Sequence, residues 1–259
     1  MERFLNNLHF GTRILLIFMV ILHIINMAFF DDAILYSLCL IPSRVIKNFE
    51  FWRLITAPFL HSGIIHLAMN MGTFLQVGMS LESAIGTLSF FYHIIVFGFI
   101  SSVIDVVLSY ILTFIGEESA YNAASIGFSG VLFALTLIDI SITKDEYRSV
   151  FGILLVPSQV YPWIILIVLQ VLMPNISLIG HLSGLLVGYM YQSGLLKWIT
   201  LSPRTLEAIE RRMCCCCTGR LGYQPSNGQR DYQPFSLFRN WFQSDSDHEE
   251  EFVGEAHTL

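Results

Sequence analysis

Long apolar stretches are the feature that most limits how this chain can fold. Six segments approach the roughly 17 to 25 residues that cross about 30 Å of hydrocarbon: 14–30, 63–79, 88–115, 126–142, 150–173 and 176–199. The composition agrees, because the 259 residues are 54% hydrophobic and 13% charged, with a mean hydropathy of +0.62. Soluble domains carry about 25% charged residues. We therefore expect an all-α polytopic membrane protein with a six-helix bundle over residues 1–200.

The fifth of these segments is interrupted. Pro157 and Pro162 flank Ser158 and Gln159. Breaks of this kind persist at membrane depth only where protein or a cavity satisfies the freed backbone groups. We expect this segment to be kinked or to begin late.

The basic residues predict the orientation of the bundle. An even number of spans places both termini on one side, and eleven of the fourteen lysines and arginines fall on that side. Because cytosolic loops are enriched in basic residues, both termini are predicted to be cytosolic. The loop at 31–62 then lies on the luminal or extracellular side, with Trp52 and Arg53 suited to the headgroup zone.

Three segments carry polar residues near their luminal ends. His66 and Asn70 begin the second segment, Ser129 the fourth and His181 the sixth. These segments run in the same direction, and at 1.5 Å per residue the depths of Ser129 and His181 differ by only about 3 Å. A lone serine or histidine in a span is more often a structural hydrogen-bonding group. The shared depth favours a pair in which His181 is the general base for Ser129.

Small residues would let the fourth and sixth segments approach closely. Gly130 and Ala134 share one helix face, and Gly184 and Gly188 share another. Faces of this small-xxx-small kind allow close helix packing. A packing role alone is the alternative, and it is compatible with an active site because close packing is what would bring the serine and histidine together.

The start of the fourth segment also suits a developing negative charge. Gly127 to Gly130 lies where a helix begins, so free backbone N–H groups and the positive end of the helix dipole point at Ser129. His66 and Asn70 are four residues apart on one helix face, where they can donate to the same oxyanion. Mutual hydrogen bonding of His66 and Asn70 at the membrane interface is the alternative.

Together these motifs resemble the rhomboid family of intramembrane serine proteases. The match runs from Phe51 to Ile199 and rests on four motifs: Trp52-Arg53, His66-Leu67-Ala68-Met69-Asn70, Gly127-Phe128-Ser129-Gly130 and His181-Leu182-Ser183-Gly184. The segments around Ser129 and His181 look most like the endoplasmic-reticulum rhomboid-4 subgroup of eukaryotes. The resemblance implies a six-span core, cleavage of transmembrane substrates, and a Ser-His dyad without a carboxylate third member. No metal or other cofactor is expected.

One position departs from many bacterial rhomboids, in which a tyrosine four residues after the nucleophile packs on the catalytic histidine. Here that residue is Phe133, which keeps the ring and lacks the hydroxyl. Two acids in the third and fourth segments, Asp105 and Asp139, are predicted to lie away from the luminal layer, bonding locally or reaching the cytosolic edge.

The end of the chain changes character. Residues 201–259 are polar, contain glycine and proline, and end in an acidic stretch, so a mostly disordered cytosolic tail is predicted.

The tail contains four consecutive cysteines: Cys214, Cys215, Cys216 and Cys217. Their position shortly after a span on the basic side favours S-acylation; zinc binding is the alternative, although consecutive cysteines do not easily form a tetrahedral site. An aromatic stripe from Phe235 to Phe242 has helical spacing and is a candidate membrane or partner contact.

The predicted function is therefore an intramembrane serine endopeptidase acting near the luminal membrane face, with membrane-protein quality control or ectodomain release as candidate roles. A non-catalytic rhomboid-fold protein that binds membrane clients is the alternative, and a transporter is a weaker third interpretation because no mid-membrane ion site is evident. The endoplasmic reticulum is the predicted location, with the Golgi or plasma membrane as alternatives. Predicted partners are transmembrane substrates, the lipid bilayer and cytosolic proteins that bind the tail, and not nucleic acid.

Overall fold

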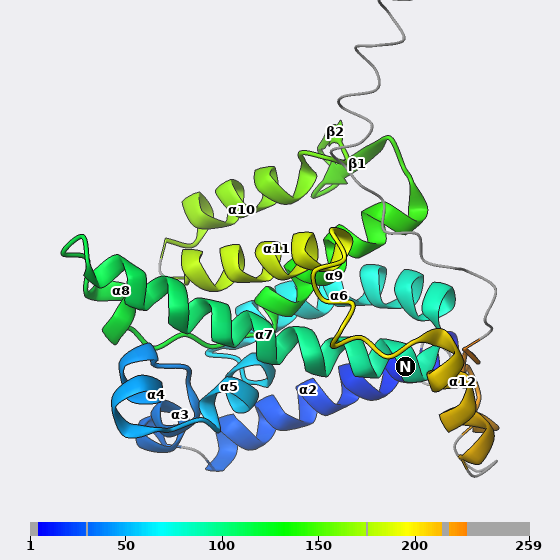
Figure 1. The fold of residues 1–259 in the computed structure, drawn as a ribbon, viewed down its shortest axis with the longest axis horizontal. Helices are drawn as coiled ribbons and strands as arrows, with labels where there is room; N and C mark the ends of the chain where they lie inside the picture. Colours follow the sequence, from blue (N-terminus) through cyan, green and yellow to red (C-terminus); the bar gives the residue numbers. More distant parts are fainter. Residues whose placement is uncertain (1–4, 30, 175, 214–217, 227–259) are drawn as a thin grey trace, which may run out of the picture.

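In the computed structural model, the chain forms a helical bundle with one small hairpin (Figure 1). The structure describes residues 5–29, 31–174, 176–213 and 218–226. The longer helices are α2 (Phe10–Phe29), α6 (Ile64–Ile85), α7 (Thr87–Thr113), α9 (Ser129–Thr143), α10 (Tyr161–Leu172), α11 (Leu178–Gln192) and α12 (Pro203–Arg212). Short helices in the connections are α3 (Asp32–Leu38), α4 (Pro42–Asn48), α5 (Arg53–Thr56), η1 (Ala57–Phe59) and α8 (Ser119–Asn122).

Each of the six apolar segments of the sequence corresponds to one helix, in the order α2, α6, α7, α9, α10 and α11. Three of them, α2, α6 and α7, are long and apolar enough to cross a membrane. Helices α9 and α10 are apolar but shorter, and α11 has 15 residues. The protein is thus a membrane protein with several apolar helices, and the count of six crossings stays a prediction.

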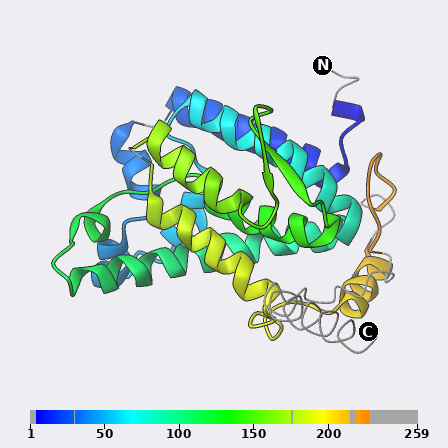
Figure 2. The ribbon, with the colours of Figure 1, turned by 90° about the horizontal axis from the view of Figure 1, so that it is seen from above.

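Helices α6, α7, α9 and α11 occupy the centre of the bundle, with α2 and α10 on opposite sides (Figures 1 and 2). Helix α9 is the most enclosed, because every residue from Val131 to Ser141 is buried. This burial matches its sequence, which is apolar around the whole circumference and not on one face only. The central core includes the fully buried rings of Phe74, Phe90 and Phe128.

The connection between α2 and α6 folds around Arg53, which is only 1% exposed. Its Nη1 donates to the carbonyl oxygens of Tyr36 at 2.7 Å and Cys39 at 2.5 Å, and its Nη2 pairs with the Glu50 carboxylate at 2.5 Å. The prediction that Arg53 faces the headgroups is therefore wrong, whereas Trp52 is exposed. The guanidinium donors are used to satisfy carbonyl groups of the loop itself.

The fifth segment corrects the all-α prediction. Its first part belongs to an antiparallel hairpin of β1 (Tyr147–Val150) and β2 (Leu154–Pro157). Helix α10 starts only at Tyr161, which confirms the expected late start. Pro162 lies in the first turn of α10, where the missing N–H of proline costs no helical hydrogen bond.

An ion pair fixes this hairpin to α9. Arg148 on β1 lies 2.7 Å from the Asp139 carboxylate and donates to Thr143 Oγ1 at 2.8 Å. Asp139 therefore bonds locally, near the end of α9 remote from Ser129, as the sequence predicted.

Part of the predicted tail is folded against the bundle. Residues 203–212 form α12, and residues 218–226, here called the C-terminal strap, bind the ends of two helices. The Phe10 N–H donates to Gly222 O at 2.9 Å, the Thr87 N–H donates to Gln224 O at 2.8 Å, and the Gln224 N–H donates to Thr87 Oγ1 at 2.9 Å. The prediction of disorder is wrong for these residues, because the strap satisfies free groups at the starts of α2 and α7. The cysteine run, the aromatic stripe and the acidic end lie outside the described residues.

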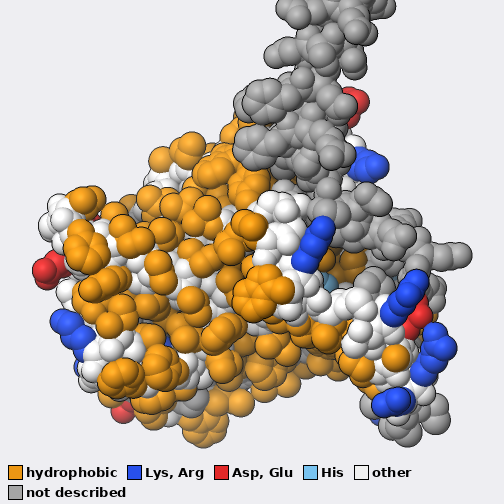
Figure 3. All heavy atoms as spheres, in the orientation of Figure 1, with side chains coloured by type: hydrophobic (Ala, Val, Ile, Leu, Met, Phe, Trp, Pro, Cys, Tyr) orange, Lys and Arg blue, Asp and Glu red, His pale blue; other side chains and the backbone are white. Residues whose placement is uncertain are grey.

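The outer surface has an apolar belt and more polar ends. In Figure 3, hydrophobic side chains cover the broad side of the bundle, and charged side chains gather mainly toward its two ends. Exposed apolar side chains on α2, α7 and α10 include Ile24, Ile95 and Ile167. Soluble monomers rarely expose large contiguous apolar patches, whereas a bundle surrounded by lipid requires them.

A buried carboxylate joins the start of α2 to the junction between α6 and α7. Glu82 Oε1 accepts from the Gly11 N–H at 2.7 Å and from Thr87 Oγ1 at 2.6 Å. Its Oε2 accepts from the N–H and Oγ1 of Thr12 at 2.7 and 2.9 Å. The carboxylate thus satisfies two of the free N–H groups at the start of α2 and lies at the positive end of that helix dipole.

We expect Glu82→Ala to destabilise the bundle by about 3–5 kcal/mol, because it leaves four buried donors without their acceptor. Glu82→Gln should cost less, since one amide oxygen still accepts. Thermal unfolding of the purified protein in detergent measures both. Glu207→Ala is the control, because Glu207 pairs with Arg211 on an exposed helix surface. Equal stability of the Glu82→Ala and Glu207→Ala proteins would contradict this role for Glu82.

Candidate active site

Ser129 is the first residue of α9. Gly127, two residues earlier, has a φ of 133°, a backbone conformation that favours glycine, and its N–H donates to Ala57 O at 3.1 Å. Phe128 is fully buried in the aromatic core and anchors the start of the helix. Ser129 therefore lies beside the free N–H groups of the first turn, at the positive end of the helix dipole.

Helices α9 and α11 pack with their backbones in contact. A Cβ on Gly184 would lie 2.7 Å from the carbonyl carbon of Gly130 and still closer to its oxygen. One turn further on, a Cβ on Gly188 would lie 3.2 Å from Ala134 O and 2.7 Å from Leu137 Cδ1. The structure thus places all four small residues of the predicted packing faces in the α9–α11 contact, where side chains would hold the helices apart.

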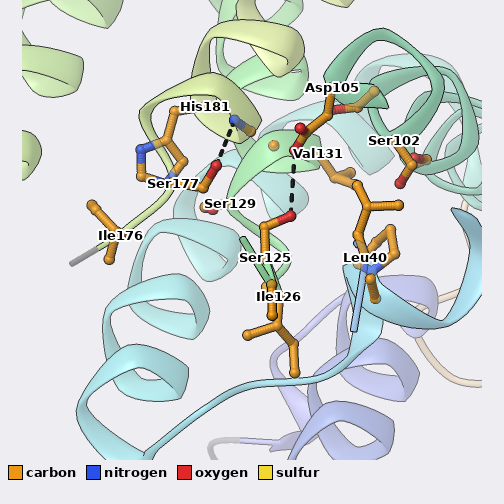
Figure 4. A pocket seen from close by; sticks show the side chains of 18 of the residues that line it. Leu40, Ser102, Asp105, Ser125, Ile126, Ser129, Val131, Ile176, Ser177 and His181 are labelled. Carbon is orange, nitrogen blue, oxygen red and sulfur yellow. Dashed lines mark hydrogen bonds between the residues drawn. The ribbon is translucent and has the colours of Figure 1, made fainter. Parts of the chain in front are cut away.

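His181 lies in the first turn of α11 and is 4% exposed. The Phe133 ring packs on it, with centroids 5.0 Å apart and an interplanar angle of 42°. The Nδ1 atom of His181 has no hydrogen-bond partner, and in the described part of the chain no hydrogen bond joins His181 to Ser129. Both residues nevertheless line the same cavity (Figure 4).

His66, in the first turn of α6, lies against Gly127. A Cβ on Gly127 would be 2.8 Å from His66 Nε2, so only glycine leaves room for the ring. His66 Nδ1 is 3.2 Å from Ser62 Oγ, and the His61 ring centroid is 5.2 Å from that of His66. Burial lowers the pKa of His61 to about 3, so this neighbour, which the sequence did not single out, is neutral at physiological pH.

Asn70 occupies a different position from His66. It is 5% exposed, and its Nδ2 donates to His66 O at 2.9 Å. The residues that line the cavity include His66 and do not include Asn70. The structure therefore separates the two predicted oxyanion donors: His66 reaches the cavity, and Asn70 supports the backbone of His66.

The cavity has a volume of about 190 Å³. Its wall contains Ser129 from α9, His181 from α11 and His66 from α6, each from the first turn of its helix. Six serines contribute to the lining: Ser62, Ser101, Ser102, Ser125, Ser129 and Ser177. A polar cavity of this size has room for several water molecules.

Asp105 also lines this cavity, which corrects the prediction that it lies away from the site. Its Oδ2 accepts from Ser125 Oγ at 3.3 Å and would lie 3.3 Å from a Cβ on Gly180 (Figure 4). The error arose from counting depth along each segment. Helix α7 has 27 residues and α9 has 15, so α7 extends past the start of α9 and carries Asp105 to the level of the site.

These features define a class: a membrane protein whose apolar helices enclose a polar cavity with a serine and a histidine on its wall. Across the described ranges, no group of three or more His, Cys, Asp or Glu side chains is arranged to hold a metal ion. A family model, the rhomboid domain, matches residues 48–198, which is more than half of the chain and includes Ser129 and His181. The chain belongs to the rhomboid family.

Similar proteins support this assignment. The chain is 34% identical to Rhomboid-like protein 15 of Arabidopsis thaliana over 178 residues, which are 68% of this chain and 44% of that protein. It is 31% identical to Rhomboid-related protein 4 of Homo sapiens over 204 residues, 78% of this chain and 62% of that protein. Identity to Rhomboid-type serine protease 2 of Neurospora crassa is 28% over 199 residues, 76% and 69% of the two chains. The predicted likeness to the rhomboid-4 group is confirmed, although the chain spans less than two thirds of the first two relatives.

The α9–α11 contact predicts opposite effects of alanine at two helical glycines. Gly184→Ala should destabilise the protein by about 1–3 kcal/mol, because its Cβ would collide with the Gly130 carbonyl. Gly72→Ala on α6 is the matched control: nothing lies within 4 Å of its Cβ, and alanine should stabilise this helix by about 0.5–1 kcal/mol. Thermal unfolding in detergent measures both, and equal stability of the two variants would refute the close contact.

Proposed function

We propose that this protein is an intramembrane serine endopeptidase that cleaves transmembrane proteins near the luminal membrane face. The observation that carries the proposal is the position of Ser129 and His181, which come from different helices and line one polar cavity beside a backbone contact. Family membership supports it, since the Neurospora crassa relative is named a serine protease.

In the proposed reaction, Ser129 Oγ attacks the scissile carbonyl carbon while a ring nitrogen of His181 takes the hydroxyl proton. The C–N bond of the tetrahedral intermediate then breaks, and His181 gives that proton to the leaving amine. A water molecule from the cavity attacks the acyl ester by the same route and restores Ser129. The hydrogen bond between Ser129 and His181 would form when substrate binds, since catalytic hydrogen bonds are often long in the free enzyme.

The developing oxyanion would be held by the Ser129 N–H and by His66, with Asn70 assisting. Support for His66 comes from its ring, which lies against Gly127 and lines the cavity. Gly127 contributes by leaving room for that ring. Asn70 would act at least in part through its hydrogen bond to the His66 carbonyl, which positions the start of α6.

The proposed setting is the endoplasmic-reticulum membrane, with six crossings by α2, α6, α7, α9, α10 and α11 and both termini in the cytosol. The resemblance to the rhomboid-4 group supports this setting, and quality control or ectodomain release are the proposed roles. Co-localisation of the tagged chain with an organelle marker tests the location, and protease protection of terminal tags tests the topology. Golgi or plasma-membrane staining would reject the location.

The tail would attach to the cytosolic leaflet through acylation of Cys214 to Cys217. Each acyl chain would contribute a membrane-binding free energy of about 0.8 kcal/mol for every methylene that it buries. This attachment would hold the aromatic stripe near the membrane, where it is a candidate site for cytosolic partners. An acyl-exchange assay on the full chain that detects no lipid would reject the proposal.

The second candidate is a non-catalytic protein that binds membrane clients. Both functions require contact with a transmembrane segment, but only the protease requires the Ser129 hydroxyl and the His181 ring. The presence of both residues on one cavity wall favours the protease.

Ser129→Ala and His181→Ala should each abolish cleavage of a co-expressed transmembrane substrate, and the double variant should be no worse, because nucleophile and base act as one unit. Immunoblotting for the cleaved fragment measures this effect. Substantial cleavage by a well-folded Ser129→Ala protein would remove Ser129 as nucleophile, and retained client binding without any Ser129-dependent cleavage would favour the non-catalytic alternative.

His66→Ala and Asn70→Ala should each lower kcat by roughly 10- to 1000-fold, since they support charge that develops mainly in the transition state. The larger loss is expected for His66, which reaches the cavity. Asn26→Ala is a control, because this buried amide donates to His61 O and does not line the cavity. An unchanged kcat in both variants would reassign the pair to structure.

A further inference from the structure

Asp105 is a buried acid with no part in the proposed reaction. It is 4% exposed, lies on α7, and shares the cavity wall with Ser129 and His181. Ser101, one turn earlier on α7, is close to the site as well, since a Cβ on Gly130 would lie 2.7 Å from Ser101 Oγ. This face of α7 therefore lies against Gly130, which follows Ser129, and against Gly180, which precedes His181.

The hydrogen bonds of Asp105 show that it does not orient the histidine. Its Oδ1 accepts from Ser109 Oγ at 3.2 Å and its Oδ2 from Ser125 Oγ at 3.3 Å (Figure 4). Among the described residues, no group binds His181 Nδ1, the atom that a third member of a triad would bind. Asp105 is thus not placed as a third catalytic carboxylate.

Other acids inside the described bundle have stronger partners than Asp105 has, either a cation or several donors. Asp139 pairs with Arg148, Glu50 pairs with Arg53, and Glu82 accepts four hydrogen bonds. Asp105 accepts two long bonds from hydroxyl groups. Among the described residues that line the cavity there is no lysine or arginine. A carboxylate buried without a cation is unfavourable, so this cavity favours a cationic guest.

We infer that Asp105 is a specificity-determining residue, which makes the site prefer a substrate with a cationic side chain on the residue whose carbonyl Ser129 attacks. This inference rests on the proposed function. That side chain lies next to the nucleophile when the carbonyl does, and the cavity beside Ser129 is where it can enter. An arginine guanidinium can bind a carboxylate through two parallel hydrogen bonds, and an acidic residue selects basic side chains in the same way in trypsin.

A different role for Asp105 would be to hold the water that hydrolyses the acyl-enzyme. The two roles differ in what a neutral residue does. Loss of a water ligand slows the cleavage of every substrate by the same factor, whereas loss of a charge partner changes the ratio between cationic and neutral substrates.

The test uses the purified full chain and one transmembrane substrate with Arg, Gln or Ala before the scissile bond. For the wild-type protein, kcat/KM should be at least about tenfold higher with Arg than with Gln, the range expected of a hydrogen bond between charged groups. Asp105→Asn and the smaller Asp105→Ser should bring the Arg-to-Gln ratio close to one. Asp139→Asn is the control acid, since its partner is Arg148, and should keep the wild-type ratio.

A second measurement does not depend on hydrolysis. In the Ser129→Ala protein, a peptide amide ending in Arg should bind at least about tenfold tighter than one ending in Gln, and adding Asp105→Asn should remove the difference. Fluorescence anisotropy of labelled peptides gives both affinities.

Two results would overturn the inference: a wild-type ratio near one, or a ratio that survives both Asp105 substitutions. An equal fall in kcat/KM for all three substrates in Asp105→Asn would assign Asp105 to water or to the fold, and so would also overturn it. Absence of Ser129-dependent cleavage of every substrate would instead refute the proposed function, and the peptide affinities would still decide the role of Asp105.

Discussion

The backbone contact between α9 and α11 is the constraint on which the rest of the structure depends. Gly130 and Gly184 allow the two helices to touch without side chains between them. Ser129 and His181 lie in the first turns of these helices, so the spacing of the backbones sets the spacing of the two functional groups. At the far end of the same contact, Gln192 donates to a backbone carbonyl of α9 at 2.7 Å and holds the pair together.

Polar groups inside the bundle differ in how completely their hydrogen-bonding capacity is used. Glu82 and Arg53 bind several partners each and connect segments that are distant in sequence. On the cavity wall, His181 Nδ1 has no hydrogen-bond partner among the described residues, and each oxygen of Asp105 accepts one long bond from a hydroxyl group. Because an unsatisfied polar group is costly in an apolar interior, saturated groups stabilise the fold, and groups with spare capacity that also line a cavity, as His181 and Asp105 do, are suited to bind something that is not part of the chain.

Local signals in the sequence were enough to locate the ends of helices and the small residues between them. Gly127 and Gly130 marked the start of α9, and most helix ends were placed within a few residues. The exceptions are the second helix, which ends later than predicted, the fifth, which starts later, and the sixth, which ends earlier. What could not be predicted depends on how helices of unequal length align, as for Asp105, or on contacts between distant segments, as for buried Arg53 and the C-terminal strap. The hairpin at 147–157 was missed because its apolar residues run almost directly into those of α10. Hydropathy alone therefore joined the two into one segment.

The start of α2 has a consequence for the order of assembly. Its backbone donors are satisfied by Glu82, at the end of α6, and by Gly222 in the C-terminal strap. Neither acceptor exists when α2 leaves the ribosome, so until the rest of the chain is made these N–H groups depend on water at the membrane edge. The helix made first is therefore completed last, and a chain whose synthesis stops before the strap lacks the acceptor for the Phe10 N–H.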